Sequence, residues 1–326
     1  MTQRLAIVER LPGHTEVMGG FAALALELGY ETHLLLNRED KFHVVDYLQT
    51  RLPIVGENIH EWSYINDPGS NFDVILLNTS YVWLDYGRSL QQWNANKRLI
   101  VVHHHPEDIE LNPHGARVYL TPAVGQEKWI FPLYSDPSLA EPGMEDASPL
   151  SVGDAAELPA LVTIGALDLK NIADVVAYMK AGGQVVHYDR HKCHHFEEHS
   201  GSYTQHVGLS GTEFMMSLAE RKQPMFLWFP ILPESNYMEN RFCGALIVGV
   251  EMNCIMVMPE RLRKLYGFPE DAVIAYDSSV TEAECVEKLR ASAMKQEERR
   301  RQLRMWAVER WRRNMDVFRS LLGERA

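Results

Sequence analysis

The chain has 326 residues, of which 46% are hydrophobic and 23% are charged, and its net charge is −12 at pH 7. This length exceeds what one hydrophobic core usually supports, so we expect two domains of about 150 residues each. The balanced composition excludes a largely disordered chain. The acidic charge disfavours broad nucleic-acid binding, because phosphate backbones repel an acidic surface.

We expect a cytoplasmic protein. Charged residues interrupt the first positions before an apolar signal-peptide core can form, and no stretch approaches the roughly 20 apolar residues that span a bilayer. The four cysteines have no paired spacing, which favours buried thiols in a reducing compartment over a disulfide framework; they are Cys193, Cys243, Cys254 and Cys285.

Strand-like and helix-like segments alternate in the first half of the chain. Apolar runs predict buried strands, and longer periodic segments predict helices; the strands cover 4–9, 31–36, 72–78 and 98–103, and the helices 15–28, 40–52 and 81–93. Such alternation indicates βαβ units and a parallel sheet. Residues 1–150 are therefore predicted to form a Rossmann-like domain.

A linker is predicted near the middle of the chain. Residues 136–157 contain six acidic residues and three prolines but no Lys or Arg, a composition typical of exposed connections. The alternation then restarts, with strands over 160–165, 184–189, 225–229 and 254–258, a short strand ending near 206–208, and helices over 171–180, 212–221 and 242–250. We place a second Rossmann-like domain at 151–305 and a C-terminal helix at 306–326.

The order of parts over residues 160–280 resembles the nucleotide-binding half of GT-B-fold glycosyltransferases. The first match is a strand that ends in a glycine and is followed by a lysine and a helix (Gly165, Lys170-Asn171), and the second is a strand with a polar end (His187-Tyr188-Asp189-Arg190). The third is a short strand followed by a glycine and a serine-capped helix (Val207-Gly208-Leu209-Ser210). The fourth is the loop that opens a helix under the donor diphosphate (Pro230 to Gly244). The first half resembles the family in topology only.

The resemblance implies an α/β fold with two Rossmann-like domains facing across a cleft, and a last helix that crosses back to the first domain. It also implies transfer of a sugar from a UDP- or GDP-linked donor to a carbohydrate or glycoconjugate acceptor, with no cofactor and no metal. The donor-binding residues that it implies are Gly165, Lys170, Tyr188, Asp189, Arg190, Ser210, Glu239, Asn240, Arg241, Phe242 and Gly244. A helix N-terminus offers unpaired N–H groups and partial positive charge to a diphosphate, and Lys170 or Arg241 would add charge-assisted bonds.

The match has one departure, and it leaves other functions open. Asn240 and Val248 stand where many retaining members carry two glutamates, while Glu239 and Glu251 are out of register. Some glycosyltransferases that modify bases in phage DNA have a similar loop. The alternatives are such a base-modifying enzyme, a nucleotide-sugar 2-epimerase of the same fold, and a non-enzymatic metal- or nucleic-acid-binding protein.

Two loops of the first half supply candidate catalytic residues. His14 and Glu16 lie at the turn after the first strand, and His103 and His105 lie on one face of an extended segment at the end of another strand. A histidine has a pKa near neutrality, which suits the general base that removes a proton from an acceptor hydroxyl. The competing interpretation is that these are ordinary polar residues at element ends.

Two further features are less specific. The histidines and cysteine between 187 and 199 match no zinc-ligand spacing, so an exposed loop explains them equally well. The segment from Lys288 to Ala326 carries twelve Lys or Arg against five Asp or Glu, with Trp306, Trp311 and Phe318 spaced along one helical face. We expect this face to pack on the first domain; the competing interpretation is a peripheral membrane or nucleic-acid contact.

Overall fold

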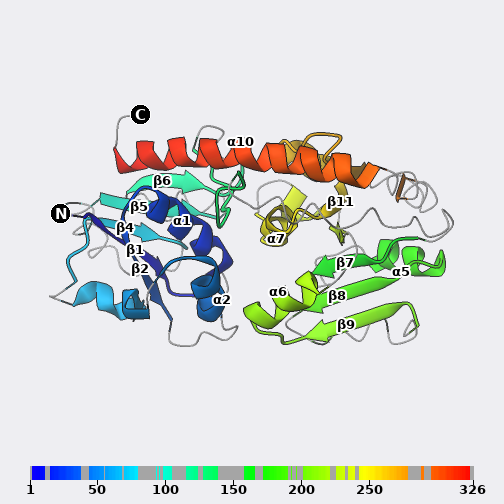
Figure 1. The fold of residues 1–326 in the computed structure, drawn as a ribbon, viewed down its shortest axis with the longest axis horizontal. Helices are drawn as coiled ribbons and strands as arrows, with labels where there is room; N and C mark the ends of the chain where they lie inside the picture. The colour runs from blue at the N-terminus through cyan, green and yellow to red at the C-terminus, as the bar shows by residue number, and fades with distance from the viewer. Residues whose placement is uncertain are drawn as a thin grey trace. The chain divides into compact units, whose positions relative to one another are not determined.

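The computed structural model describes most of the chain, and Figure 1 shows its helices and strands in chain order. The described residues are 2–11, 15–37, 44–54, 56–67, 70–79, 93, 95, 98–104, 115–123, 128–138, 158–165, 172–189, 192, 196, 201–220, 225–231, 234–238, 242–277, 288–289 and 295–323. None of the described helices is both long and apolar enough to cross a lipid bilayer.

Contacts within the chain define two compact units. The first unit comprises Met1–Asp136, Asn240–Gly244 and Glu309–Ala326, and the second comprises Pro137–Glu239 and Ala245–Val308. The predicted boundary between 150 and 151 lies outside the described residues. The predicted boundary between 305 and 306 lies within the long helix α10 (Gln296–Leu322).

The first unit contains a parallel sheet of six described strands. They are β1 (Arg4–Glu9), β2 (Glu31–Leu36), β3 (Ile59–Glu61), β4 (Val74–Leu77), β5 (Arg98–His103) and β6 (Ala116–Tyr119). Their order is β3-β2-β1-β4-β5-β6, which is the Rossmann order. β1, β2 and β5 are buried at five of six positions each, as expected for strands covered on both faces.

The described strands of the second unit repeat this topology. They are β7 (Leu161–Ile164), β8 (Val185–Asp189), β9 (Tyr203–Val207), β10 (Phe226–Trp228), β11 (Ile255–Pro259) and β12 (Val273–Tyr276), all paired in parallel. Their order is β12-β11-β10-β7-β8-β9, so the unit's first and fourth strands again lie side by side. The predicted α/β fold with two Rossmann-like halves is confirmed.

Helices connect these strands. The described ones are α1 (Thr15–Glu27), α2 (Val44–Arg51), α5 (Ile172–Lys180), α6 (Gly211–Ala219), α7 (Ala245–Glu251), α8 (Glu260–Tyr266) and α10, with the short 3-10 turns η1 (Gly56–Asn58), η2 (Trp62–Asn66) and η7 (Asn236–Met238). Most of the predicted helix over 81–93 lies outside the described residues. Four described elements were not predicted from the sequence, namely β3, β6, α8 and β12.

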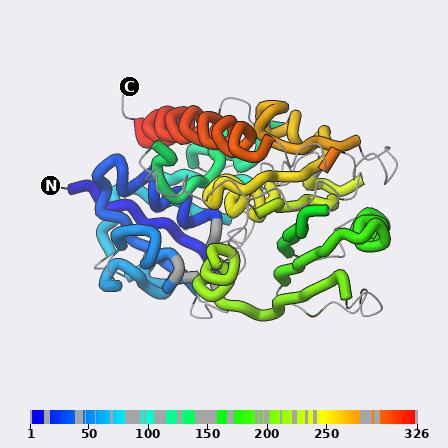
Figure 2. The backbone as a smooth tube through the Cα atoms, turned by 45° about the vertical axis from the view of Figure 1, so that its right-hand side comes forward, coloured from blue at the N-terminus to red at the C-terminus, as the bar shows by residue number. Residues whose placement is uncertain are grey.

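The C-terminal part of α10 packs on the first unit, as predicted. The Phe318 ring contacts the Phe21 ring of α1 at 6.1 Å between centroids. The Arg310 guanidinium stacks over Trp129 at 3.7 Å, and burial lowers its pKa to about 10, which still leaves it charged at neutral pH. Figure 2 shows α10 as the red end of the tube. The buried aromatic face therefore serves packing within the protein.

Asn314 forms the most specific contact of this helix. Its Oδ1 accepts a hydrogen bond from the Phe131 backbone N–H at 3.1 Å, and its Nδ2 donates to the Phe131 carbonyl at 2.5 Å. Asn314 is fully buried. One side chain thus bonds both backbone polar groups of a residue outside any strand. The Phe131 carbonyl also accepts from the Leu133 N–H at 2.8 Å, so the buried Phe131 N–H depends most on Asn314.

Replacing Asn314 with alanine should destabilise the first unit by about 2–3 kcal/mol, because the buried Phe131 N–H loses its hydrogen bond to Asn314 and the Phe131 carbonyl loses one of its two. Urea unfolding followed by tryptophan fluorescence measures the change. The control is Arg313→Ala, an exposed position on the same helix with a 4.0 Å ion pair to Glu309; it should change stability by less than about 0.5 kcal/mol. Equal effects of the two variants would contradict this account.

A stacked histidine pair lies between β2 and β3. The His33 Nδ1 and His60 Nε2 atoms are 3.2 Å apart, and the His60 ring stacks on Tyr64 at 4.1 Å between centroids. Glu31 and Arg4 also contact the His33 ring, at 2.9 and 3.2 Å from Nε2. One proton can bridge the two imidazoles, whereas two protonated rings would direct N–H groups at each other.

We expect the first unit to lose stability as the pH falls from 7.5 to 5. Burial is the largest cause that lowers the pKa of both His33 and His60, so the unfolded chain takes up protons at higher pH than the folded chain. The loss therefore begins near the ordinary histidine pKa of about 6.5 and continues down to the lowered folded-state values. Thermal unfolding across this range measures it. The variant His60→Phe keeps the ring stack but has one fewer titrating group, so it should lose less stability than the wild type between pH 7.5 and 5. A larger loss of stability in the variant would refute the explanation.

Candidate functional site

Both sheets share a feature that positions ligand sites. In the Rossmann order, the chain leaves the first strand in one direction along the sheet and the fourth strand in the other, which opens a crevice at their carboxyl ends. These switch points lie between β1 and β4 in the first unit and between β7 and β10 in the second. We therefore describe the residues at each carboxyl edge.

A buried carboxylate lies at the switch point of the first unit. Glu9, the last residue of β1, has 0% exposure. Its Oε1 accepts a hydrogen bond from the Leu11 backbone N–H at 2.7 Å. Its Oε2 accepts from Asn78 Nδ2 at 2.7 Å and from the Thr79 hydroxyl at 2.6 Å. Asn78 and Thr79 follow β4 directly, so Glu9 connects the ends of the two strands that flank the switch point.

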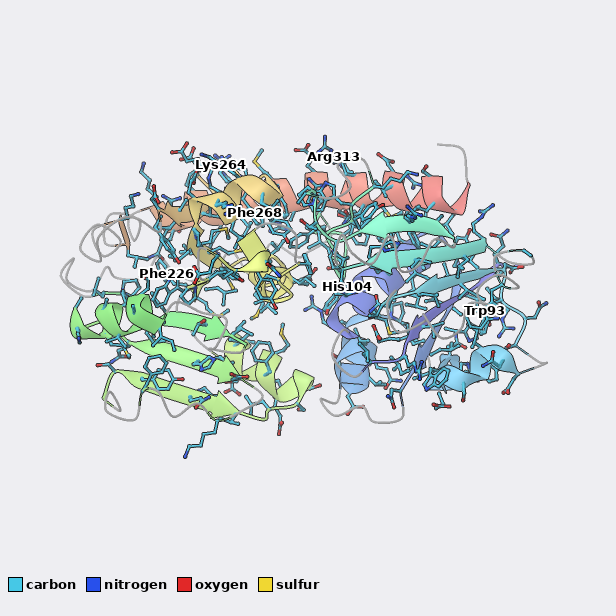
Figure 3. All side chains as sticks on the ribbon, turned by 180° about the vertical axis from the view of Figure 1, so that it is seen from behind. Trp93, His104, Phe226, Lys264, Phe268 and Arg313 are labelled. Carbon is cyan, nitrogen blue, oxygen red and sulfur yellow. The ribbon has the colours of Figure 1, made fainter. Side chains whose placement is uncertain are left out.

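Two histidines continue this edge at the end of β5. His104 is buried, and its Nε2 donates to the Asn78 carbonyl at 2.7 Å. His103 is also buried, and its ring lies 5.6 Å from the Tyr119 ring at the end of β6. Figure 3 labels His104 at this end of the first sheet. Four neighbouring strands therefore end in polar or aromatic side chains, which form one hydrogen-bonded set at β1, β4 and β5 and one ring pair at β5 and β6.

In the second unit, a buried histidine anchors the backbone after β7. His187 has 0% exposure, and its Nε2 lies 2.8 Å from the Gly165 carbonyl oxygen. Because a carbonyl only accepts, Nε2 carries the proton, and in the neutral ring Nδ1 accepts from the Tyr203 hydroxyl at 2.7 Å. Gly165 has a φ of +87°, a conformation that favours glycine. His187 and Tyr203 thus fix the backbone at the start of the loop after β7.

The adjacent residues Tyr188 and Asp189 complete this edge. The Tyr188 ring stacks on His206 at 4.7 Å, and its hydroxyl lies 2.9 Å from the Ser217 hydroxyl on α6. The Asp189 carbonyl accepts from the Gly208 N–H at 3.1 Å, and Gly208 has a φ of +67°. Two left-handed glycines, at the ends of β7 and β9, therefore lie on either side of the end of β8.

Ser210 begins α6 with a reciprocal capping arrangement. Its hydroxyl oxygen accepts from the Glu213 N–H at 3.2 Å, and the Glu213 carboxylate accepts from the Ser210 N–H at 2.9 Å. This is the capping box that fixes where a helix starts. Ser210 has this structural role whether or not it also contacts a ligand.

The structure brings some of the predicted site residues together. Gly165, Tyr188 and Asp189 gather at one sheet edge, with Ser210 close behind Gly208 in sequence. Glu16 lies in the first turn of α1, and only its backbone is described. The predicted residues outside the described ranges are His14, His105, Lys170, Arg190, Glu239, Asn240 and Arg241. The predicted roles of all these residues stay predictions.

The segment directly before α7 belongs to the first unit. Phe242, predicted to contact the donor, packs its ring edge-on against Phe131 at 5.6 Å between centroids. Gly244 directly precedes α7. Residues 240–244 are accordingly grouped with the first unit, although the sequence analysis assigned them to the second domain.

Four residues at the two edges were not in the predicted site. Glu9, Asn78, His104 and His187 are all buried. Their signal in the sequence is a polar residue at or just after the end of an apolar strand, which is where parallel sheets place ligand sites. Within the described residues, no group of three or more His, Cys, Asp or Glu side chains is arranged to hold a metal ion.

The variant Gly165→Ala should destabilise the second unit by about 1–2 kcal/mol, because a side chain disfavours the left-handed backbone. A Cβ built at this position meets no described heavy atom within 4 Å, so backbone strain is the main cost. Gly201→Ala is the matched control, since its Cβ also meets no described atom and its φ lies outside the left-handed region. Thermal unfolding measures both, and an equal loss for the two would contradict the strain argument.

Comparison with known proteins identifies the architecture. No protein-family model matches the sequence, and no curated protein matches it. Among solved structures, the chain is similar to sucrose-phosphate synthase from Thermosynechococcus elongatus, with a TM-score of 0.57 and 11% identity over 98% of this chain and 99% of the other. It is also similar to Anabaena HepE, solved in complex with UDP, with a TM-score of 0.59 and 10% identity over 99% and 100%. The two parallel sheets and this likeness along nearly the whole chain show that the protein has the fold of GT-B glycosyltransferases.

Proposed function

We propose that the protein transfers a sugar from a nucleoside-diphosphate sugar to an acceptor hydroxyl. The observation that carries this proposal is the carboxyl edge of the second sheet, where Gly165, Asp189 and Gly208 gather at three neighbouring strand ends. The Anabaena structure with the same fold was solved with UDP, which supports a nucleotide as the ligand of this edge.

In this proposal the second unit binds the donor. Glycines at Gly165 and Gly208 let a ligand approach the backbone closely, because they carry no side chain. The Asp189 carboxylate is a suitable acceptor for ribose hydroxyl groups, and Tyr188, held by its stack on His206, supports the strand end beside it. Lys170 and Arg190 follow strand ends in the sequence, and they would neutralise the phosphate charge.

The first unit binds the acceptor and supplies the base, which is one of His14, Glu16, His103 or His105. The base removes the proton from the acceptor hydroxyl, and the oxygen forms a bond to the anomeric carbon of the donor sugar. The bond between that carbon and the diphosphate breaks, and the nucleoside diphosphate leaves with the electron pair. A general base of this kind typically contributes 10²–10⁴-fold to the rate.

Calorimetric titration with UDP and with GDP tests the donor site. We expect one of them to bind, and Asp189→Asn to weaken that binding at least about tenfold, equivalent to about 1.4 kcal/mol. Asp174→Asn, on the first turn of α5, is the control and should leave the affinity unchanged. Failure of both nucleotides to bind at millimolar concentration would refute the proposal.

The alternative enzyme class is a nucleotide-sugar 2-epimerase. A protein from Listeria monocytogenes assigned to UDP-N-acetylglucosamine 2-epimerase shares the fold, with a TM-score of 0.50 and 10% identity over 92% of this chain. Incubation with the donor sugar alone separates the two classes. A new epimer without any acceptor would indicate the epimerase, whereas a product that requires the acceptor would indicate the transferase.

A further inference from the structure

The loops that carry the proposed acceptor-side residues begin at the ends of β1 and β5, and β4 lies between these two strands in the sheet. The chain leaves β1 through Leu11 toward His14 and Glu16, and it leaves β5 through His104 toward His105. The chain leaves β4 through Thr79. Any group that fixes the starts of these loops also sets where their side chains can reach.

One set of hydrogen bonds joins all three starts, and we name it the Glu9 clasp. It consists of Glu9, Leu11, Asn78, Thr79 and His104. Glu9 accepts from the Leu11 N–H, the Asn78 amide and the Thr79 hydroxyl at 2.6–2.7 Å, while His104 donates to the Asn78 carbonyl at 2.7 Å. Asn78 is also tied into the sheet, since its N–H donates to the Val8 carbonyl at 2.9 Å. The clasp therefore spans β1, β4 and β5.

The chemistry of the clasp requires a carboxylate. All three partners of Glu9 donate, and an ionised carboxylate has acceptor sites for each of them. A glutamine at this position would direct its own N–H groups toward one of the donors. The bonds are short, and those from Asn78 and Thr79 are buried, so each of these two bonds, if unmade, would leave a desolvated polar group.

Glu9 is not suited to be the base itself. Both carboxylate oxygens already accept hydrogen bonds from protein donors, one from Leu11 and the other from Asn78 and Thr79. An acceptor hydroxyl would have to displace the Leu11, Asn78 or Thr79 donor to reach it. Its position instead suits a residue that acts through others.

We propose that Glu9 is a positioning residue: it fixes the described residues with which the chain leaves β1, β4 and β5, and so positions the acceptor-side residues after β1 and β5 for sugar transfer. This inference rests on the proposed function for its role in the reaction. The contacts that define the clasp stand independently of that function. Loss of the clasp should misplace the acceptor and base while leaving the donor site of the second unit unchanged.

The test uses Glu9→Gln in the full-length protein, with Asn314→Ala as a control that is also destabilised but lies outside the clasp. We expect transfer to the acceptor to fall about 100-fold in Glu9→Gln, since small misplacements of reacting groups have effects of this size. The affinity for UDP or GDP and the slow hydrolysis of the donor by water should stay within about twofold. Asn314→Ala, assayed below its unfolding transition, should retain transfer activity.

A second variant tests whether restoring the hydrogen bonds also restores the transfer activity. In Glu9→Gln combined with Asn78→Asp, the amide and the carboxylate exchange places, so the Gln side chain donates one N–H to the Asp side chain while its oxygen still accepts from Leu11. The Thr79 hydroxyl, which donates in the wild type, then accepts from the second N–H of the Gln amide. We expect the double variant to recover most of the lost transfer. The two single substitutions would then be non-additive, as expected for residues in direct contact.

Hydrogen exchange measured by mass spectrometry gives a readout that does not require activity. Glu9→Gln should increase exchange together in peptides that cover 10–18, 78–92 and 103–114, while the peptides of α5 and α8 keep their wild-type rates. Unchanged exchange in two of these three peptides would contradict the claim that Glu9 holds the starts of all three segments. Equal losses of donor binding and acceptor transfer would also overturn the positioning role. If the wild type neither binds a nucleotide nor transfers a sugar, the proposed function fails, and exchange still decides whether Glu9 holds the loops.

Discussion

Parallel pairing of buried strands is the constraint on which the rest of this structure depends. Strands that run in the same direction end at the same edge of their sheet, so the segments that follow them gather there. In both units the strand order places the first and fourth strands side by side, which concentrates polar residues at one place in each sheet. Glu9, Asn78 and Thr79 gather in the first unit, and Gly165, Asp189 and Gly208 lie on adjacent strands in the second.

Burial then dictates how these polar groups are organised. A carboxylate or an imidazole without contact with water must find partners within the protein, because an unmade bond there costs more than it would at the surface. Glu9 and His187 both satisfy this requirement by binding backbone groups at strand ends, namely the Leu11 N–H and the Gly165 carbonyl. The same bonds hold the loop starts in place, so stability and positioning have one physical cause at these sites.

The last helix is organised by the same principle. Its aromatic residues bury an apolar face, while Arg310 and Asn314 are buried polar residues with specific partners, the Trp129 ring and the Phe131 backbone. Near its start, Arg299 donates to the Val273 carbonyl at 2.6 Å and Arg300 to the Asn253 carbonyl at 3.2 Å. Two of the arginines that make this segment basic, Arg299 and Arg300, therefore serve as hydrogen-bond donors to backbone carbonyls within the fold. These contacts explain part of the positive charge of the last helix.

Several elements and the overall architecture could be predicted from the sequence. Strong apolar runs predicted β1, β2 and β5 at their observed bounds, and the alternation of strands with helices predicted two parallel sheets. Elements with a weak local pattern were not predicted from the sequence. β3 has three residues, β6 has the polar sequence ARVY, and the helix α8 begins directly at the end of β11 with four charged residues among seven. In these elements, pairing and burial against neighbours outweigh the local propensity.

The sequence by itself determined which segments are strands buried on both faces, and hence the fold class, because the apolar period of a segment is a local property. It also indicated the polar residues of the second unit through their resemblance to a known family. Only the tertiary structure decided that Glu9, Asn78, Thr79 and His104 form one network, since their bonds join residues 26 to 70 positions apart. Such contacts depend on strand order and register, and no local pattern in the chain encodes either of them.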